Sequence, residues 1–255
     1  MRVTFLGTGA AGGVPLYGCN CKACARAARD PRHARLPCSA LIESAGTRVL
    51  IDAGLTDLHE RFPPGFLSAI VLTHYHPDHV QGLFHLRWGK GEPLPVHGPP
   101  DSEGCADLFK HPGLLAFRPA RKFEAFEIGA LRLTPLPLVH SKPTLGYAIE
   151  GPRGQRFAYL TDTLGLPPKS AAFLRDWGAF DMAIDCSYPP QPAPRNHNDW
   201  LAAHQCVAAT GARTAWFTHL SHAVDAWLLE ERPSPAGNVR LASDGTCIDI
   251  PDAGP

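Results

Sequence analysis

THYHPDHVQG, residues 73–82, is the stretch of this chain that decides its fold, and it follows the apolar run AIVL. Four side chains of metal-binding type lie within it: His74, His76, Asp78 and His79. A strand that ends at His74, a turn, and a helix that starts near Asp78 would bring all four together. So dense a set of ligands favours two metal ions over one. A histidine-rich surface loop is the alternative, but it does not account for the strand before and the helix after.

The composition limits the kind of partner. The chain has 255 residues and 44% hydrophobic content, which is enough to bury a sizeable core. Lys plus Arg equals Asp plus Glu at 24 each, so the chain lacks the broad basic field that captures nucleic acid or an anionic membrane. We therefore expect a small-molecule substrate, with no nucleic-acid partner and no membrane partner.

The amino-terminal segment and the cysteines indicate in which cellular compartment the protein is expected. Residues 1–10, MRVTFLGTGA, lack the long apolar stretch of a signal peptide, and no run has the length needed to span a bilayer. The eight cysteines belong to a chain far longer than a disulfide-stapled miniprotein. This pattern favours reduced thiols, and we expect a cytoplasmic protein.

Short runs with the pattern of strands alternate with helical segments. The expected strands cover 2–6, 39–44, 47–54, 69–74, 130–140, 145–151, 155–162, 181–187 and 214–219. The expected helices cover 55–62, 78–88, 103–110, 167–177, 198–210 and 223–231. Several of these strands end on His or Asp. The pattern predicts an α/β protein in which helices cover sheets and the strand ends form a common rim.

The H-x-H-x-D-H order at 74–79 resembles the signature of the metallo-β-lactamase-fold hydrolases. Further residues match that superfamily in order along the chain: Asp52 in LIDAG, His140 in LPLVH, Asp162 in YLTDT and His219 in WFTH. The resemblance implies an αββα sandwich of the α/β class, formed as a single domain over 1–255. Each of these residues ends a strand-like run, where such a sandwich opens its site.

The same resemblance implies the ligands of a dinuclear centre. One metal would be held by His74, His76 and His140, and the second by Asp78, His79 and His219. Asp162 would bridge the two metals, and Asp52 would orient a histidine from behind. Two such cations activate water and polarise the substrate, so a phosphodiester or a strained carbonyl is the natural substrate class. Asp78 and Asp162 are thus expected to be catalytic, and the ligand set suits zinc, manganese or iron alike.

A second candidate metal site lies in YGCNCKACARA, residues 17–27. Its three thiols belong to Cys19, Cys21 and Cys24. A closed tetrahedral zinc site needs a fourth ligand, and the other five cysteines lie in apolar or helical runs typical of buried thiols. His222 follows His219 by three positions, and the resemblance places the fourth ligand of a structural Zn²⁺ there. The expected zinc-binding loop covers about 17–26, with three free surface thiols as the alternative.

Features outside the ligand series resemble one family of this superfamily over nearly the whole chain. They are FLGTGAAGGVPLYGCNCKACARA, QGLFHLRWGKGEPLPVHGPPD, GCADLFKHPGLLAF, LTPLPLVHSKPTLGY, PRNHND and THLSHAVDAWL. The family comprises the PhnP-like phosphoribosyl cyclic phosphate phosphodiesterases of the carbon–phosphorus lyase pathway. The resemblance implies hydrolysis of 5-phospho-α-D-ribosyl 1,2-cyclic phosphate to α-D-ribose 1,5-bisphosphate during phosphonate breakdown. It also implies manganese at the catalytic sites, with zinc as the alternative, and a cytoplasmic homodimer.

The segment PRNHND adds His197 just before the helix expected at 198–210. By resemblance it matches an extra active-site histidine, which would protonate the leaving sugar oxygen or hold the phosphate. The N-terminus of a helix is also a favourable place for phosphate. Weaker phosphate candidates are Arg195, Lys142 and Ser141, since polar loops carry such residues for solubility as well.

Other functions could use the same ligands. A transfer-RNA 3′-end endonuclease shares the LGTG turn, but no Lys/Arg-rich arm for RNA is visible. A lactone or thioester hydrolase would use the metals without needing His197. A protein resembling the pyrroloquinoline-quinone biosynthesis member of the superfamily, acting as an oxidoreductase or carrier, also has a cysteine zinc site. A non-enzymatic metal-binding module is disfavoured, because the complete ligand set would have no use.

Overall fold

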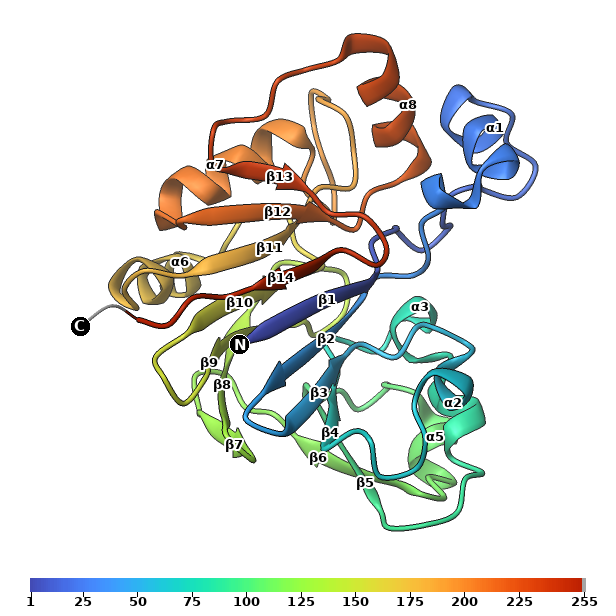
Figure 1. Cartoon of the computed structure of the whole chain (residues 1–255), viewed down its shortest axis with the longest axis vertical. Coiled ribbons are helices and arrows are strands. Elements are labelled where there is room, and N and C mark those ends of the chain that lie inside the picture. The colour runs from blue at the N-terminus through green and yellow to red at the C-terminus, as the bar shows by residue number, and fades with distance from the viewer. Residues whose placement is uncertain (254–255) are drawn as a thin grey trace.

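The computed structural model describes residues 1–253 and arranges their strands in two seven-stranded sheets (Figure 1). The first sheet, in the order β14-β1-β2-β3-β4-β5-β6, contains β1 (Arg2–Gly7), β2 (Ser39–Ser44), β3 (Thr47–Ile51), β4 (Ala69–Val71), β5 (Leu94–Gly98), β6 (Leu115–Pro119) and β14 (Cys247–Asp249). The second, in the order β13-β12-β11-β10-β9-β8-β7, contains β7 (Phe126–Ile128), β8 (Leu131–Pro137), β9 (Leu145–Glu150), β10 (Arg156–Leu160), β11 (Asp181–Asp185), β12 (Thr214–Thr218) and β13 (Val239–Leu241).

The helices are α1 (Lys22–Arg29), α2 (Leu58–Arg61), α3 (Pro77–Val80), α4 (Leu83–Leu86), α5 (Ala106–Lys110), α6 (Pro168–Asp176), α7 (Trp200–Thr210) and α8 (His222–Glu231), with a 3₁₀ turn at Pro31–His33. Helices cover the outer faces of both sheets, except that α1 lies away from the sheets and packs against α8 (Figure 1). Within 1–253, no helix combines the length and the apolar composition needed to cross a membrane.

Each sheet changes from antiparallel to parallel pairing partway across. In the first sheet, neighbours from β14 to β3 are antiparallel and neighbours from β3 to β6 are parallel. In the second, neighbours from β7 to β10 are antiparallel and neighbours from β10 to β13 are parallel. The carboxyl ends of parallel strands meet at one edge of a sheet, where loops collect functional side chains. The pairing therefore gathers the residues that follow β3, β4, β10, β11 and β12.

Side-chain alternation along β3 shows how the layers form. Val49 and Ile51 face the apolar core between the two sheets, whereas Leu50 faces the core beneath the helices of the first sheet. All three side chains are fully buried, as expected for a strand covered on both faces. A third core lies beneath α6, α7 and α8 and includes Leu174 and Phe217. The layers are therefore helices, sheet, sheet and helices, and the predicted αββα sandwich is confirmed.

The expected helix at 78–88 is wrong in its extent, because the structure divides it into α3 and α4 around Gly82. A Cβ atom at Gly82 would collide with the carbonyl oxygen of Leu55, so the close passage of the two segments requires glycine. The strand before it is also shorter than expected and ends at Val71. His74 therefore lies in the connection after the strand rather than on it.

Several short elements have no clear signal in the sequence: β5, β6, β7, β13, β14 and α1. Pro95 lies within β5 and Pro119 ends β6, and proline disfavours a strand because it cannot donate a ladder hydrogen bond. The strands β7, β13 and β14 have three residues each, too few for an alternating pattern to show. Tertiary pairing, rather than local preference, forms these strands.

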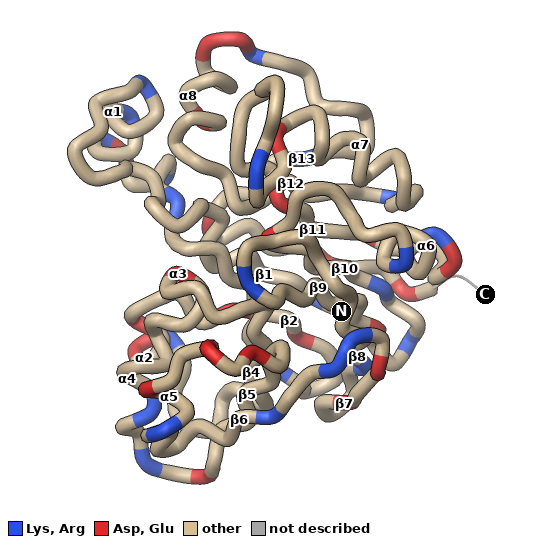
Figure 2. The backbone as a smooth tube through the Cα atoms, turned by 180° about the vertical axis from the view of Figure 1, so that it is seen from behind, with Lys and Arg blue, Asp and Glu red and all other residues tan. Residues whose placement is uncertain are grey.

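Charged residues of both signs are spread over the fold. Figure 2 shows Lys and Arg interspersed with Asp and Glu over both halves of the molecule. This distribution agrees with the balanced count of 24 residues of each sign.

Candidate dinuclear metal centre

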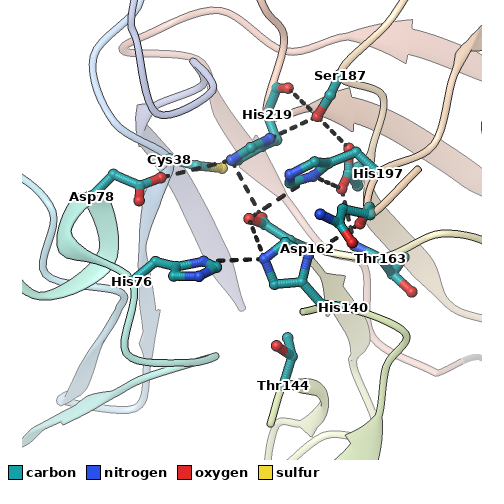
Figure 3. Close-up of polar contacts among 12 residues, drawn as sticks. Cys38, His76, Asp78, His140, Thr144, Asp162, Thr163, Ser187, His197 and His219 are labelled. Carbon is teal, nitrogen blue, oxygen red and sulfur yellow. Dashed lines mark hydrogen bonds and ion pairs between the residues drawn. The ribbon is translucent and has the colours of Figure 1, made fainter. Parts of the chain in front are cut away.

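The predicted metal ligands converge at the edge where strands of both sheets end. Figure 3 shows His76, Asp78, His140, Asp162 and His219 around a common centre. The first sheet contributes Asp52 after β3 and the four residues of the THYHPDHVQG stretch after β4, while the second contributes His140 after β8, Asp162 after β10 and His219 after β12. The structure therefore brings the whole predicted ligand set together.

His74, His76 and His140 form the first group. Nδ1 of His76 lies 2.8 Å from Nε2 of His74 and 3.1 Å from Nε2 of His140. Nδ1 of His74 contacts the hydroxyl of Thr73 at 3.0 Å, and Nδ1 of His140 contacts the carbonyl oxygen of Asn196 at 3.1 Å. Because a carbonyl only accepts, His140 donates from Nδ1 and keeps its lone pair on Nε2. Three imidazole nitrogens thus face one point, as ligands of a single cation would.

Asp78, His79 and His219 form the second group. Oδ2 of Asp78 lies 3.2 Å from Nε2 of His79 and 3.9 Å from Nε2 of His219. Nδ1 of His79 lies 2.8 Å from the carboxylate of Asp52, which also accepts hydrogen bonds from the amide and hydroxyl of Thr73. Asp52 therefore holds the proton of His79 on Nδ1 and leaves Nε2 free for the centre.

Asp162 is buried between the two groups. Its Oδ2 lies 3.5 Å from Nε2 of His79 and 3.8 Å from Nε2 of both His74 and His140. Its Oδ1 lies 3.3 Å from Nε2 of His219. One carboxylate thus faces ligands of both groups, which is the geometry that a bridging residue needs.

Asp185, at the end of β11, is a residue of the site that the sequence analysis did not select. It is fully buried, and its Oδ1 accepts a hydrogen bond of 2.7 Å from the hydroxyl of Ser187. That hydroxyl lies 2.8 Å from Nδ1 of His219, so Nδ1 donates to Ser187 and Nε2 faces the centre. Asp185 ends the run DMAID as Asp52 ends the run TRVLID, and the same strand-end signal could have found it.

His197 lies beside the centre, and 16% of its side chain is exposed. Its ring stacks on that of His219 with centroids 4.8 Å apart and meets the ring of His140 edge-on at 4.9 Å (Figure 3). Its Nδ1 lies 2.7 Å from Oδ2 of Asp185. Because that carboxylate accepts the Nδ1 proton, Nε2 is the nitrogen available to a substrate.

The helix after His197 does not offer its N-terminus to a phosphate. α7 begins at Trp200, and the side chain of Asp199 caps it by accepting a hydrogen bond of 2.8 Å from the amide of Ala202. The cap places a carboxylate where an anion would bind. The structure therefore gives no support to the expectation of phosphate at this position.

The weaker phosphate candidates differ in their surroundings. Nζ of Lys142 lies 3.5 Å from Oδ2 of Asp101, so its charge is already paired. Ser141 is exposed on the connection that carries His140. Arg195 is also exposed, on the loop before α7, and forms no ion pair with any residue of 1–253. Of the two charged candidates, Arg195 is thus the one whose charge is free for an anionic substrate.

Three buried atoms of the centre have no hydrogen-bond partner among the described residues: Nε2 of His79, Oδ1 of Asp162 and Nε2 of His219. An unpaired buried polar atom costs about 1–3 kcal/mol. Divalent cations bound to these atoms would remove that cost. The buried, unpaired imidazole and carboxylate donors therefore fit a pair of divalent cations of the manganese, iron or zinc type.

The electrostatics of the centre differ between its two groups. Burial lowers the pKa of His74 and of His140, which keeps both rings in the neutral form that binds a cation. Burial also disfavours charge on His219, but the carboxylates of Asp162 and Asp78 outweigh it and raise the pKa of His219 to about 9. Without metal, these carboxylates favour the protonated form of His219, and that proton would have to leave for a cation to bind.

The residues of the predicted zinc site also meet. The ligand atoms of Cys19, Cys21, Cys24 and His222 lie within 4.8 Å of one another. Nδ1 of His222 is 3.4 Å from Sγ of Cys19 and 3.5 Å from Sγ of Cys21. The expected loop at 17–26 is helical from residue 22 onward, because Cys21 caps α1 and Cys24 lies in its first turn. With His222 opening α8 beside α1, the four ligands suit a tetrahedral Cys₃His zinc ion.

Fold and site together define a class of protein: an αββα sandwich whose strand ends carry a His and Asp centre for two cations. The profile of the beta-lactamase superfamily domain matches residues 47–220, and the chain belongs to that superfamily.

Particular relatives differ in their named activities. The crystal structure of a new diphosphatase from the PhnP family superposes with a TM-score of 0.79 and 28% identity, covering 97% of each chain. An octanoyltransferase of Porphyromonas gingivalis is 33% identical over 181 residues, which is 64% of this chain and 35% of that protein. Ribonuclease Z of Methanopyrus kandleri is 33% identical over 158 residues, which is 58% of this chain and 50% of that protein. The chain thus spans about a third to a half of these two curated relatives.

Replacing Cys21 by Ser should remove one zinc ion per chain and leave the catalytic metals largely in place, because the two sites share no ligand. Metal analysis of the purified protein measures both. Cys247→Ser is the control, since this thiol is exposed and lies outside the cluster. An unchanged zinc content in Cys21→Ser would refute the zinc assignment.

Replacing Asp185 by Asn should weaken the binding of one cation by about 10- to 100-fold, because the hydrogen-bonded chain through Ser187 to His219 loses its carboxylate acceptor. Calorimetric titration of the metal-free protein measures the affinity. Asp176→Asn, an exposed aspartate at the end of α6, is the control. Equal affinities in the two variants would show that Asp185 does not support His219.

Proposed function

We propose that the protein is a metal-dependent phosphodiesterase that hydrolyses 5-phospho-α-D-ribosyl 1,2-cyclic phosphate to α-D-ribose 1,5-bisphosphate in phosphonate breakdown. The observation that carries the proposal is the contact of 2.7 Å between Nδ1 of His197 and Oδ2 of Asp185, at the edge of the predicted dinuclear centre. It leaves one imidazole nitrogen for a leaving oxygen beside the metal-binding residues. A thioester hydrolase has no need of this arrangement, because a thiolate leaves without a proton.

The two catalytic cations would be held by the ligand groups described above. His74, His76 and His140 would hold one, Asp78, His79 and His219 would hold the other, and Asp162 would lie between them. When bound, such cations stabilise the charged phosphate oxygens as Lewis acids and activate water for attack. Manganese is the proposed catalytic metal, with zinc as the alternative.

The product determines which bond breaks. In α-D-ribose 1,5-bisphosphate the phosphate stays on C1, so the oxygen of water adds to phosphorus and the bond from phosphorus to the C2 oxygen breaks. The departing C2 oxygen needs a proton, which Nε2 of His197 would supply as general acid. Asp185 holds the other nitrogen of this ring and so keeps Nε2 for the substrate.

The relatives support phosphorus chemistry. A named diphosphatase of the PhnP family is 28% identical and shares the fold over 97% of both chains. Its name also favours a second candidate function, the cleavage of a diphosphate. Ribonuclease Z relatives raise the alternative of RNA processing, but the charges of this chain balance at 24 of each sign, and residues of the two signs are interspersed along the described backbone (Figure 2). A small phosphorylated ribose fits this balance of charge better than a polyanion does. The proposed enzyme is a cytoplasmic homodimer.

Metal-loaded protein should hydrolyse bis(p-nitrophenyl) phosphate slowly and the ribosyl 1,2-cyclic phosphate much faster, because the second substrate matches the proposed reaction. Phosphorus NMR identifies the product as the 1,5-bisphosphate. ADP and a transfer-RNA precursor serve as comparison substrates. Inertness toward both diesters would remove the proposal, and faster turnover of ADP would favour the diphosphatase candidate.

Replacing His197 by Ala should lower turnover of the ribosyl cyclic phosphate by about 10²- to 10⁴-fold, because its alkoxide leaving group needs a general acid. Hydrolysis of bis(p-nitrophenyl) phosphate should fall much less, since p-nitrophenolate leaves without a proton. His111→Ala, at an exposed histidine after α5, is the control. Equal losses on both substrates would contradict the general-acid role and indicate that His197 binds the phosphate.

A further inference from the structure

The candidate ligand His140 has no support from a strand or helix. β8 ends at Pro137 and β9 begins at Leu145, so His140 lies in the connection between them. Its Nε2 faces Nδ1 of His76 at 3.1 Å, and the hydrogen bond that orients the ring from the other side runs from Nδ1 to the carbonyl oxygen of Asn196, also at 3.1 Å. The orientation of this ligand therefore depends on a segment 56 residues away in the sequence.

That segment is the loop between β11 and α7, and its sequence is rich in proline. Four of the six residues at 189–194 are proline, which restricts the backbone on the approach to Asn196. At its far end the carbonyl of Asn198 accepts a hydrogen bond of 2.9 Å from the amide of Ser187. The side chain of Asn198 also accepts one of 2.7 Å from the amide of Gly165. The loop is thus fastened at its base to the strands that carry the centre.

Asn196 itself has a left-handed backbone with φ of 62°. A positive φ at the centre of a three-residue turn is rare and strained for a residue other than glycine. The turn is tight, since the amide of His197 donates a hydrogen bond of 2.7 Å to the carbonyl of Arg195. Across this turn, the carbonyl of Asn196 reaches His140 while the side chain of His197 reaches Asp185.

We propose that Asn196 is a positioning residue for the metal ligand His140: its left-handed backbone directs a carbonyl that sets the tautomer and orientation of the imidazole. The carbonyl accepts only, so the proton of His140 stays on Nδ1 and Nε2 keeps its lone pair for a cation. The requirement falls on the backbone at 196, because its carboxamide makes no hydrogen bond with another residue of 1–253. The inference rests on the proposed ligand role of His140 and is independent of the substrate.

The loop before α7 links a candidate metal ligand to the proposed general acid. One loop supplies, in adjacent residues, the acceptor that orients a ligand of the first metal and the histidine proposed as general acid. The conformation at Asn196 therefore sets the position of a metal ligand relative to the proton donor.

Asn196→Val and Asn196→Gly test the inference as a matched pair. Both remove the carboxamide, but glycine accepts a positive φ and a β-branched residue resists it. Calorimetric titration of the metal-free protein with Mn²⁺ should show one cation bound about 10- to 100-fold more weakly by Asn196→Val and both bound normally by Asn196→Gly. In the zinc-loaded protein, the Nδ1 proton resonance of His140 should persist in the Gly variant and be lost by exchange with water in the Val variant. Thermal unfolding and the zinc content of the cysteine site verify that each variant folds.

His140→Ala separates the possible failures. If this variant binds both cations like the parent, the ligand role of His140 and the inference fall together. If it loses a cation while Asn196→Val keeps parental affinity and the Nδ1 resonance, the positioning role alone is overturned. Equal weakening in the Val and Gly variants would overturn the requirement for a left-handed backbone. Neither readout uses hydrolysis, so a failed phosphodiesterase assay leaves this test unaffected.

Discussion

The burial of one carboxylate, Asp162, against imidazole nitrogens from both sheets constrains the rest of this structure. Nε2 of His79, which follows the first sheet's β4, lies 3.5 Å from it, and Nε2 of His219, which follows the second sheet's β12, lies 3.3 Å from it. An apolar core holds the sheets face to face, but apolar contacts alone do not specify how far one sheet slides over the other. The ligand atoms at the strand ends would, because a cation bound between the sheets needs ligands from both of them, and a small displacement would move half of those ligands out of reach.

In each half of the molecule, an aspartate at the end of a strand orients the ring of a histidine of the centre. In the first, Asp52 follows β3 and binds His79 directly; in the second, Asp185 ends β11 and reaches His219 through the hydroxyl of Ser187. Asp52 and His219 both have a φ of 58°, a left-handed conformation that non-glycine residues adopt rarely and often at functional sites. A buried carboxylate behind each histidine fixes which nitrogen faces the centre. The site therefore depends on these supporting aspartates as much as on the ligands.

The amino-terminal segment that carries the cysteine cluster and α1, called the amino-terminal arm below, connects to the centre through α8. His222, the predicted zinc ligand, opens that helix and follows His219 by three residues. A second tie lies nearby, where the guanidinium of Arg35 binds the carboxylate of Asp225 on α8 at 2.7 Å, with both side chains largely buried. Zinc would thus fasten an arm that an ion pair already holds at its base. Its role would be to set the arm against the end of the catalytic strand, and it would take no direct part in the reaction.

The sequence by itself determined the parts of the site that are local or that carry a distinctive side chain. The ligands within 73–82 are close in the chain, so almost any strand, turn and helix over that stretch brings them together. Asp162 and the other distant members could be selected because each is a His or Asp after an apolar run. The tertiary structure alone decided which carboxylate supports which histidine, and it alone assigned a part to Asn196. The physical reason is that these contacts join segments far apart in the chain, and the contact from Asn196 comes from a backbone carbonyl, which every residue possesses and no sequence pattern distinguishes.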